Sequence, residues 1–474
     1  MPPRKIYFNG IDGTTGNYLM EPQTIKAVAK AARHDRPDRK RLRQAPRGAT
    51  RGLPFNVDPS DVAKAGWGVV FHKAESADVK KKLEALLEHR RKTVTDATRL
   101  KVLDYESGET TREWLNRHEV DAGTVTPSKV PYYLLVIGSP DKVPFSFTQD
   151  LDAEYAVGRL SFDTPGEYEQ YVASLTSYER TSSIKNGKEA VFFGTRHDFD
   201  AATQLSADYL VRPLATEAFE DGKPVSESVG FRSTSTVGAK ATREALRGIL
   251  SGKPGSAPPS LLFTATHGVG FALGDERQRP TQGALVCQDW PAVGQISDGH
   301  YLSAAQVPDD ARLSGLVAIF FACYGAGTPR YDRFWRGERK GPPQIATEPF
   351  VAALPRKLLA HPSGGALACI GHVERAWGSG IVNADAGPQL QLWQSLVGRI
   401  LSGQPIGLAL KDMNERYASL SVTLTGYLDQ EAETEKPIED YKLAETWLDR
   451  NDAGGYILLG DPAGRLRTAD LVGT

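Results

Sequence analysis

The sequence predicts an α/β fold in three layers, with a mostly parallel central sheet and helices on both faces. The first observation is an alternation of predicted strands and helices: short apolar runs closed by Gly or Pro alternate with stretches of helical apolar spacing. The second is size, since 40% of the 474 residues are hydrophobic and can bury more than one core. The third is that two apolar runs, Leu261–Ala265 and Val317–Ala322, lead to a reactive side chain closely followed by glycine.

Two short runs predict the first part of the sheet. Tyr132–Gly138 is apolar, too short for a helix and followed by Pro140, and Tyr155–Leu160 is a second run of this kind. Thr164–Glu167 then offers an N-cap, a proline at the first helical position and a reciprocal glutamate, so we expect a helix to begin there. The buried face of this helix is marked by Tyr168, Tyr171, Val172, Leu175 and Tyr178.

The second part of the sheet is predicted to open at Ala190–Gly194, after a polar hinge at residues 181–188. Four strand-helix steps follow. Their helices are expected near 201–214 and 241–250, and their strands near 230–236, before His267, before Cys323 and near 364–370. Because parallel strands end at one edge, His267 and Cys323 should meet at the carboxyl-terminal edge of the sheet, where open α/β folds bind ligands.

Two helices and a strand close the chain. Trp393–Leu401 has helical spacing and stops before Gly403, and a second stripe runs from Ile406 to Tyr417. Tyr456–Pro462 is expected to complete the sheet. The chain is therefore divided into an N-terminal segment with a basic loop (1–60), an N-terminal α/β subdomain (61–187) and a main α/β domain (188–474).

Charge and cysteine content narrow the class of protein. The net charge of -1 argues against a general nucleic-acid binder. The three cysteines cannot form a disulfide framework and the first residues lead into no long apolar stretch, so we expect a cytoplasmic protein without signal peptide or membrane span. We interpret the arginine-rich run Arg33–Arg51 as a solvated loop; the alternatives are an arm for an acidic partner and a protease-sensitive linker.

Cys323 and His267 are the candidate catalytic pair. A thiol attacks as its thiolate, and a cysteine beside an imidazole can form an imidazolium–thiolate pair near neutral pH. Taken singly, a cysteine that ends an apolar strand is usually inert, and a histidine before glycine usually caps an element or fills a core. Together, with the His roughly 50 residues before the Cys, they favour catalysis. Folding must then bring sulfur and imidazole together in a cleft that a polypeptide can enter.

The blocks Thr266–Gly268 and Ala322–Gly325 resemble those of the caspase-like (clan CD) cysteine peptidases, in particular the gingipain-like and bacterial CHAT protease group. Weaker likenesses lie in Val143-Pro144 after the Gly138 strand, in Val157–Leu160 and in Leu459–Pro462. The resemblance implies a caspase-like three-layer fold over 188–474, preceded by the smaller subdomain.

The resemblance implies a cysteine endopeptidase that cleaves protein or peptide bonds through a thioester acyl-enzyme, in regulated intracellular proteolysis such as bacterial defence or cell-death signalling. Cys323 would be the nucleophile and His267 the general base and acid. The backbone N–H groups of Gly268 and Cys323 would form the oxyanion hole, which a glycine lets the substrate approach. No cofactor or metal is implied. Asp141 is the candidate that orients the imidazole; its alternative is a turn residue after Pro140.

Cleavage after basic residues is one expectation for specificity. Asp150 and Asp152 stand where gingipain-like chains carry a pocket aspartate, and could pair with a substrate Arg or Lys; the alternative is an acidic surface loop. Glu374 and Arg375 are opposite candidates for reading substrate charge, so they predict different substrates. Trp377 is similar in position to a pocket-lining tryptophan of gingipains.

The segment 328–343 is charged, aromatic and broken by Gly and Pro, so we expect a mobile loop over the site. By analogy with caspase linkers it could be cut at Arg336, Arg339 or Lys340. The expected partner is a protein or peptide substrate, with neither nucleic acid nor membrane. The rival interpretation is a silent caspase-like scaffold that binds a partner, or a zymogen that awaits an activating protein partner.

Three weaker signals are interpreted as structural. Gly10–Gly16 resembles a phosphate loop only loosely, because the Lys-Ser/Thr ending is absent, and is taken as a turn. Cys287 and Cys369 are isolated in sequence, so no zinc-ligand spacing is present. His372 is taken as a strand-end residue.

Overall fold

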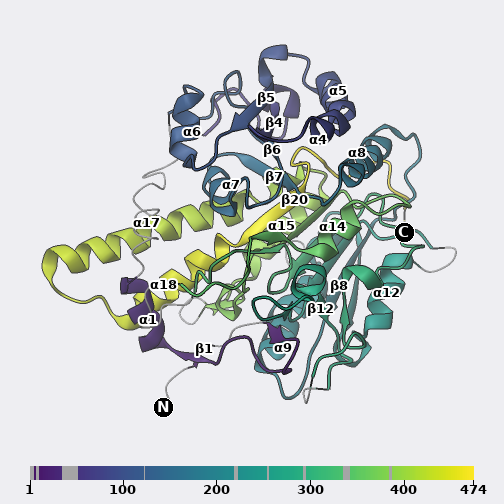
Figure 1. Ribbon diagram of the computed structural model, residues 1–474. Coiled ribbons are helices and arrows are strands. Elements are labelled where there is room, and N and C mark those ends of the chain that lie inside the picture. The colour runs from purple at the N-terminus through teal and green to yellow at the C-terminus, as the bar shows by residue number, and fades with distance from the viewer. Residues whose placement is uncertain are drawn as a thin grey trace.

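The computed structural model describes residues 5–6, 10–34, 52–121, 123–217, 222–252, 256–291, 295–334, 342–383 and 387–473. Within them one ten-stranded sheet crosses the whole molecule, with helices on both sides of it (Figure 1). The predicted α/β fold with a large, mostly parallel sheet is confirmed. The strands are β4 (Trp67–His72), β5 (Leu100–Tyr105), β6 (Tyr133–Ile137), β7 (Ala156–Leu160), β8 (Glu189–Gly194), β9 (Arg232–Val237), β10 (Leu261–Ala265), β14 (Val317–Phe321), β17 (Ala368–His372) and β20 (Tyr456–Gly460).

The strand order decides which loops can meet. It is β5-β4-β6-β7-β20-β17-β14-β10-β8-β9, and neighbouring strands are parallel except β17 and β20. The strands from β5 to β20 therefore point one way and those from β17 to β9 the other. As a result, the loops after β8, β10 and β14 leave one edge of the sheet, and the loop after β6 leaves the opposite edge.

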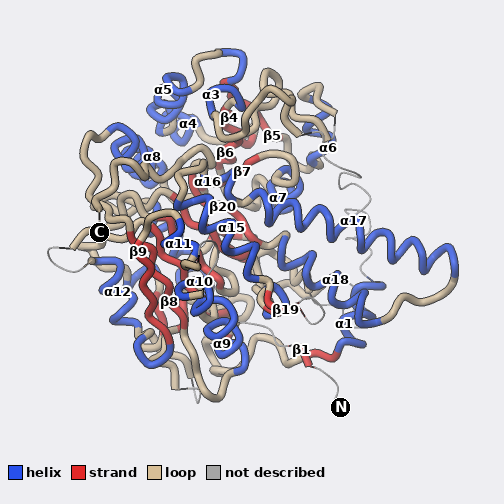
Figure 2. The backbone as a smooth tube through the Cα atoms, turned by 180° about the vertical axis from the view of Figure 1, so that it is seen from behind, coloured by secondary structure: helices blue, strands red, loops and turns tan. Residues whose placement is uncertain are grey.

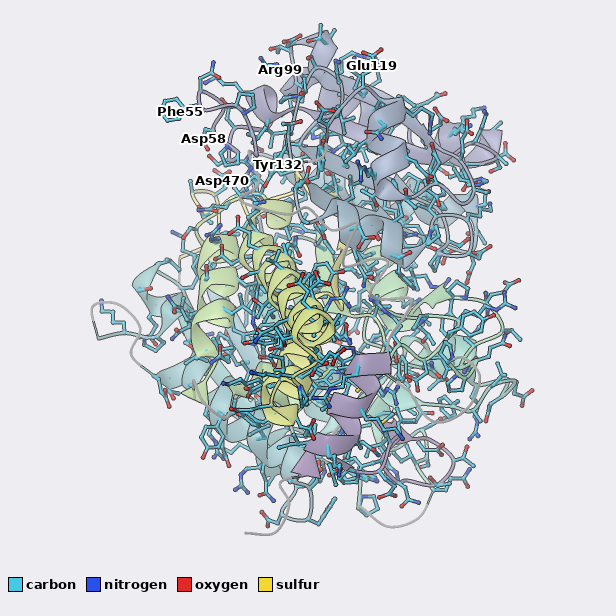
Figure 3. The ribbon with its side chains drawn as sticks, turned by 90° about the vertical axis from the view of Figure 1, so that its left-hand side faces the viewer. Phe55, Asp58, Arg99, Glu119, Tyr132 and Asp470 are labelled. Atoms are coloured by element: carbon cyan, nitrogen blue, oxygen red, sulfur yellow. The ribbon has the colours of Figure 1, made fainter. Side chains whose placement is uncertain are left out.

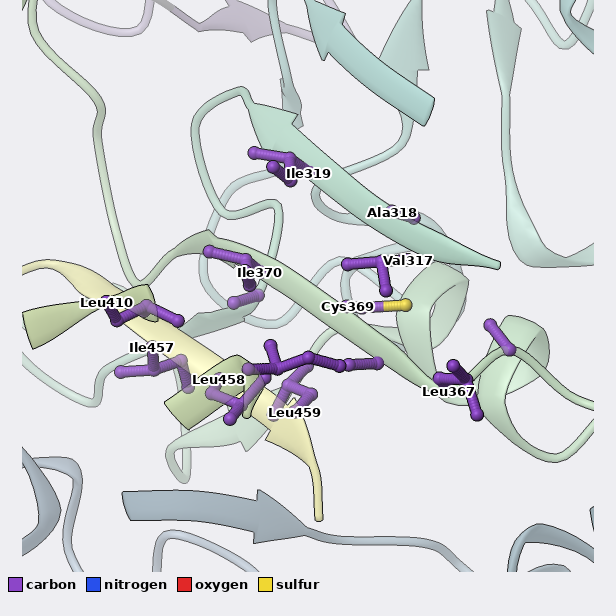
Figure 4. Packing of buried hydrophobic residues seen from close by; sticks show 14 of the residues in the cluster. Val317, Ala318, Ile319, Leu367, Cys369, Ile370, Leu410, Ile457, Leu458 and Leu459 are labelled. Carbon is purple, nitrogen blue, oxygen red and sulfur yellow. The ribbon is translucent and has the colours of Figure 1, made fainter. Parts of the chain in front are cut away.

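Two helices show how the faces of the sheet are covered. Ile319 is paired with Phe263, so their side chains share one face, and the ring of Trp393 from α15 (Leu390–Leu401) lies 5.5 Å from that of Phe263. Cys369 and Ala318 share the other face, where the Cys369 sulfur lies 3.9 Å from a backbone oxygen of α14 (Ala353–Leu359). Figure 4 shows apolar side chains of β14, β17 and β20 packed together, among them Ile319, Cys369 and Leu458. The central strands are thus buried on both faces, as in other parallel sheets.

The helix predicted after Thr164 is α8 (Pro165–Arg180), and Thr164 and Glu167 form its capping box. The predicted helix at 201–214 consists of α9 (Ala201–Ser206), a π-helical turn and α10 (Arg212–Thr216). The last predicted helix, from Ile406 to Tyr417, extends further along the chain, because α17 (Lys411–Thr434) ends only at Thr434. The other helices are α3 (Val62–Ala65), α4 (Ala77–Lys82), α5 (Glu84–Thr93), α6 (Thr111–Arg117), α7 (Phe145–Leu151), α11 (Val225–Ser228), α12 (Arg243–Ser251), α13 (Gln278–Thr281), α16 (Ile406–Ala409), α17 (Lys411–Thr434) and α18 (Asp440–Ala453). Figure 2 shows α10, α11 and α15 over the β8 side of the sheet.

The last strand joins the two parts that the sequence separates at residue 187. β20 lies between β17 and β7, so both parts share one sheet and one core. Directly after it, Asp461 accepts hydrogen bonds from Trp67 Nε1 at 3.0 Å and from Arg90 Nε at 2.9 Å. Arg90 also pairs with Glu179 of α8 at 2.8 Å. Figure 3 shows the part built around β4–β7, whose labelled residues include the exposed Phe55, Asp58 and Glu119.

The N-terminal segment lies against the second half of the molecule. β1 (Lys5–Ile6) pairs with β3 (Gln23–Thr24), and β2 (Ile11–Asp12) pairs in parallel with β11 (Val269–Gly270). Helix α1 (Ile25–His34) packs on α18, and Figure 1 shows this purple segment running from α18 toward α9. The run Arg33–Arg51 was interpreted as a solvated loop, but its first two residues end α1, where Arg33 pairs with Glu431 and Asp440; residues 35 to 51 lie outside the described residues. Of the helices described, none combines the length and apolarity needed to cross a membrane.

Candidate active site

The register of β10 and β14 brings His267 and Cys323 to the same level. Ala265 is paired with Phe321 at the ends of these parallel strands, and each reactive residue follows its strand end by the same number of residues. Thr266 donates its backbone N–H to Phe321 O at 3.1 Å, so the two chains stay adjacent as they leave the sheet. The structure thus brings the predicted pair together at one sheet edge.

Gly268 lets the two turns touch. A β-carbon built on it would lie 1.8 Å from Cys323 O and 3.0 Å from Cys323 N, so any larger residue would collide with the backbone of the cysteine. The cysteine turn is itself unusual, since Tyr324 has φ of 57° and donates its N–H to Glu374 O. A tyrosine in this left-handed region is costly and is held there by its surroundings. The glycine is thus needed for the contact between the two turns, whereas the oxyanion hole expected of Gly268 stays a prediction.

The imidazole of His267 is fixed at both nitrogens. Its Nδ1 accepts the backbone N–H of Gly10 at 2.8 Å, and its Nε2 lies 2.7 Å from Asp200 Oδ2. Because Nδ1 accepts, Nε2 carries the proton and donates it to the carboxylate. The rings of Tyr18 and Trp290 pack edge-on at 5.7 and 5.9 Å. His267 is therefore a buried, oriented imidazole in a single tautomer.

Asp200 is the residue that orients the ring, and the sequence analysis missed it. It caps α9, where its carboxylate accepts the N–H groups of Ala202 and Thr203, and Tyr18 donates its hydroxyl to the same carboxylate. Burial alone would raise the pKa of Asp200, but His267 and these hydrogen bonds lower it below its ordinary value. Asp200 is thus an anion that stabilises the proton on Nε2.

One signal could have found Asp200. It follows β8, which is the parallel neighbour of β10, with Gly194 paired to Ala265. Its loop therefore leaves the same sheet edge as His267. Asp141 follows β6, which points the opposite way, so the proposed orienting role falls to Asp200 instead of Asp141.

The thiol of Cys323 is completely buried. Its sulfur lies 3.9 Å from Ala376 O, and a β-carbon built on Gly10 would come within 3.0 Å of it. Burial raises the pKa of the thiol above its ordinary value, so the sulfur is protonated in this conformation. The expected imidazolium–thiolate pair is therefore not the state of the closed site, in which Gly10 occupies Nδ1.

The two predicted pocket aspartates hold internal structure. Asp152 is buried and accepts the N–H of Val157 at 2.9 Å, which fixes the entry into β7. Burial raises its pKa to about 8. Asp150 lies 3.5 Å from the Tyr417 hydroxyl of α17. In this conformation both carboxylates serve contacts within the protein.

Glu374 and Arg375 are also buried. The Arg375 guanidinium pairs with Asp332 and lies 3.1 Å from Glu374 Oε1, so both residues that the sequence offered to a substrate are bound within the protein. Burial, with the nearby Asp332, raises the pKa of Glu374 to about 8 although Arg375 opposes the shift. Glu374 and Arg375, the two candidates for recognising substrate charge, therefore contact each other in this structure.

Trp377 lies beneath the N-terminal helix. It packs against Phe334 at 4.5 Å between ring centres, in a cluster that includes Val28, Ala29 and Ala32 of α1. Its backbone N–H donates to Asp452 at 3.0 Å. Of the predicted loop at 328–343, the described part includes Phe334, whereas Arg336, Arg339 and Lys340 lie outside the described residues. The surface expected to wall a substrate pocket is covered by the chain itself.

No family model matches the sequence, and no curated protein matches it. Among solved structures, a protein described as a protease is 13% identical with a TM-score of 0.46, over 85% of this chain and 78% of that chain. The Arg specific cysteine proteinase gingipain R is 13% identical with a TM-score of 0.43, over 87% of this chain and 80% of that chain. The complex of the RgpB pro- and mature domains of Porphyromonas gingivalis is 13% identical with a TM-score of 0.42, over 85% of this chain and 80% of that chain. These likenesses concern the overall fold.

Proposed function

We propose that the chain is a cysteine peptidase that hydrolyses peptide bonds with Cys323, His267 and Asp200. One observation carries this proposal. The imidazole of His267 is held at Nε2 by Asp200 and presents Nδ1, at 2.8 Å, to a peptide nitrogen beside the Cys323 thiol. An oriented imidazole that contacts an amide nitrogen beside a thiol supplies the base, the leaving-group acid and the nucleophile that acyl transfer from a peptide needs.

In the proposed reaction, Nδ1 of His267 takes the proton of the Cys323 thiol as the sulfur attacks the substrate carbonyl carbon. The backbone N–H groups of Gly268 and Cys323 would stabilise the negative oxygen. Nδ1 then gives its proton to the leaving nitrogen, and the peptide bond breaks to leave a thioester. Water, deprotonated by the same imidazole, hydrolyses the thioester and restores the thiol. Asp200 stabilises the imidazolium in both steps.

The closed site supports a peptidase that is restrained until it opens. The thiol is buried and the imidazole is occupied by Gly10, so an external peptide has to displace the N-terminal segment first. This agrees with the zymogen interpretation, in which a protein partner opens the site. A preference for basic residues remains a prediction; the pair Asp332 and Glu374, which now binds the guanidinium of Arg375, is its only support among the described contacts.

The test is cleavage of a peptide library by full-length protein, with a readout of the residues around each cut. Wild type is compared with Cys323→Ala and with Cys287→Ala, a matched control that removes another buried thiol. A Gly10→Val variant opens the site, because its side chain would collide with the Cys323 sulfur. We expect hydrolysis that is lost in Cys323→Ala and kept in Cys287→Ala.

The silent scaffold is the competing outcome. If neither wild type nor Gly10→Val shows hydrolysis that depends on Cys323, the peptidase proposal is wrong. Labelling with a thiol-directed peptide probe gives a second readout. The probe should react with Cys323 in Gly10→Val faster than with Cys287 or Cys369, and His267→Ala in that background should slow the reaction.

A further inference from the structure

The segment Gly10–Leu19, called the strap below, begins between the two candidate catalytic residues, because Gly10 contacts His267 and lies beside the Cys323 sulfur. Its first residue donates its backbone N–H to His267 Nδ1 at 2.8 Å. A general acid must reach the nitrogen of the bond that it helps to break, at about 2.6–3.2 Å between heavy atoms. The Gly10 nitrogen therefore stands where the nitrogen of a scissile peptide bond would stand.

The sulfur lies on the other side of the same residue. A β-carbon on Gly10 would come within 3.0 Å of Cys323 Sγ, 3.1 Å of Cys323 Cβ and 2.7 Å of a Leu19 methyl group. Gly10 also has φ of 106°, a conformation that residues with a side chain rarely adopt. Both space and backbone conformation thus require glycine next to the sulfur.

Beyond Gly10 the strap binds as an added β-strand. Ile11 donates its N–H to Gly268 O at 3.1 Å, and Gly13 donates to Gly270 O at 2.8 Å. This main-chain pairing is how many proteins hold extended peptides. The Ile11 side chain is 1% exposed and lies in an apolar cluster with Val269, Phe271 and Trp290. These contacts all lie on the carboxyl-terminal side of the Gly10 nitrogen, where a leaving group would be bound.

We propose that the strap is the peptidase's first substrate, and that the site takes peptides with glycine directly after the scissile bond and a branched apolar residue next. This rests on the proposed peptidase function and deepens it, since it names the class of leaving group. The bond that breaks is the peptide bond to the Gly10 nitrogen.

The Cys323 sulfur bonds to the carbonyl carbon of that peptide bond after giving its proton to His267, and the carbon–nitrogen bond breaks. The Gly10 nitrogen takes the proton from Nδ1 and becomes a terminal amine. A water molecule then splits the thioester, which leaves a carboxylic acid on the released N-terminal peptide and a thiol on Cys323. The hydrogen bond seen in the closed site is the same contact with donor and acceptor exchanged.

The first measurement is the N-terminus of untagged full-length protein after incubation, by intact mass and peptide mapping. Wild type should yield a chain that begins at Gly10, and Cys323→Ala should stay intact. A Gly10→Val chain should not be cut at this bond but should cleave added peptides. Gly274→Val is the matched control, because Gly274 also has positive φ, at 86°, and an added β-carbon there meets no atom within 4 Å.

The second measurement uses a synthetic peptide of residues 1–20 as added substrate for the Gly10→Val protein. The peptide should be cut before Gly10, and its Gly10→Ala version should be cut at least about tenfold more slowly, the smallest effect usual for one extra carbon in a tight site. If library peptides are cleaved through Cys323 while the chain stays intact and both synthetic peptides react equally, this inference is wrong and the peptidase function stands. If no cleavage depends on Cys323, both are wrong.

Discussion

Asp200 and His267 form a buried carboxylate–imidazole pair, with Oδ2 and Nε2 separated by 2.7 Å. The pair fixes the tautomer in which Nδ1 is an acceptor and receives the N–H of Gly10, the residue beside the Cys323 sulfur. It joins the loops after two neighbouring parallel strands, β8 and β10, so the sheet itself sets the distance. The first prediction follows from this pair.

Asp200→Asn should lower kcat/KM by roughly 10²–10⁴-fold, because an amide neither favours the required tautomer nor stabilises an imidazolium. The rates are measured in the Gly10→Val background, in which the cleft is open. Asparagine can still cap α9 but loses the buried charge, so circular dichroism at the assay temperature checks that the variant is folded. Asp141→Asn is the control and should leave kcat/KM as it is. Equal losses in the two variants would contradict the assignment of Asp200.

Gly268→Ala should reduce kcat/KM by about 10²-fold or more, because the new β-carbon would overlap Cys323 O and push the two turns apart. The control is Gly248→Ala, since a β-carbon at Gly248 in α12 meets no atom within 4 Å. Circular dichroism checks that both variants fold. Full activity in folded Gly268→Ala would show that the close approach of the two turns is not needed.

Asp152→Asn should make stability less dependent on pH. The folded-state pKa of Asp152 is raised to about 8, so between the unfolded value near 3.8 and pH 8 the folded state binds more protons than the unfolded state. The free energy of unfolding of wild type therefore falls as pH rises through this window. The variant carries no ionisable group at this position. Its free energy of unfolding minus that of wild type should therefore increase from pH 5 to pH 8.

We expect this difference in free energy of unfolding to increase by at least about 1.4 kcal/mol, the equivalent of one pKa unit, between the two pH values. Urea unfolding at pH 5 and pH 8 measures it. Asp150→Asn is the comparison, because Asp150 lies two residues earlier, in the last turn of α7, and is only half-buried. The same pH slope for wild type and Asp152→Asn would contradict the buried, protonated carboxyl.

Arg33→Ala should increase activity toward added peptides in the otherwise wild-type chain. Arg33 of α1 pairs with Glu431 at 3.0 Å and Asp440 at 2.5 Å and donates to Ile438 O at 2.7 Å, so it fastens the N-terminal segment to α17 and α18. Losing such partly exposed pairs costs about 0.5–1 kcal/mol, which is roughly a two- to fivefold gain in open protein. The initial rate of peptide hydrolysis by Arg33→Ala, compared with that of wild type, measures this gain.

The matched control for Arg33 is Arg91→Ala, which breaks an exposed pair with Glu88 on α5. It should leave the peptide hydrolysis rate unchanged. An Arg33→Ala chain that is no more active than wild type would mean that α1 does not hold the site closed.

Much of the fold was predictable because its signals are local. The capping box of α8 and the apolar runs of β6, β8, β10 and β14 lie within short stretches of sequence. Cys323 and His267 were found for the same reason, since each stands next to a run that can only be a buried strand. The long α17 was underestimated, although Leu424 and Leu428 continue its buried face beyond Tyr417; only the turns after Leu428 carry no buried residue.

Asp200 and Gly10 could not be found in this way. Asp200 looks like any helix cap, and Gly10 looks like any turn glycine, because their neighbours in sequence say nothing of the imidazole between them. The predicted pocket residues Asp152, Glu374 and Trp377 were placed by resemblance, and the structure buries all three.

The sequence by itself determined the α/β layers and the two strand ends that carry a thiol and an imidazole, since periodicity and capping act over a few residues. Only the tertiary structure decided that β17 and β20 oppose each other, which carboxylate reaches His267 and that the chain's own Gly10 lies between His267 and Cys323. These relationships join residues far apart in the chain, and they depend on strand order and packing, which no local pattern encodes.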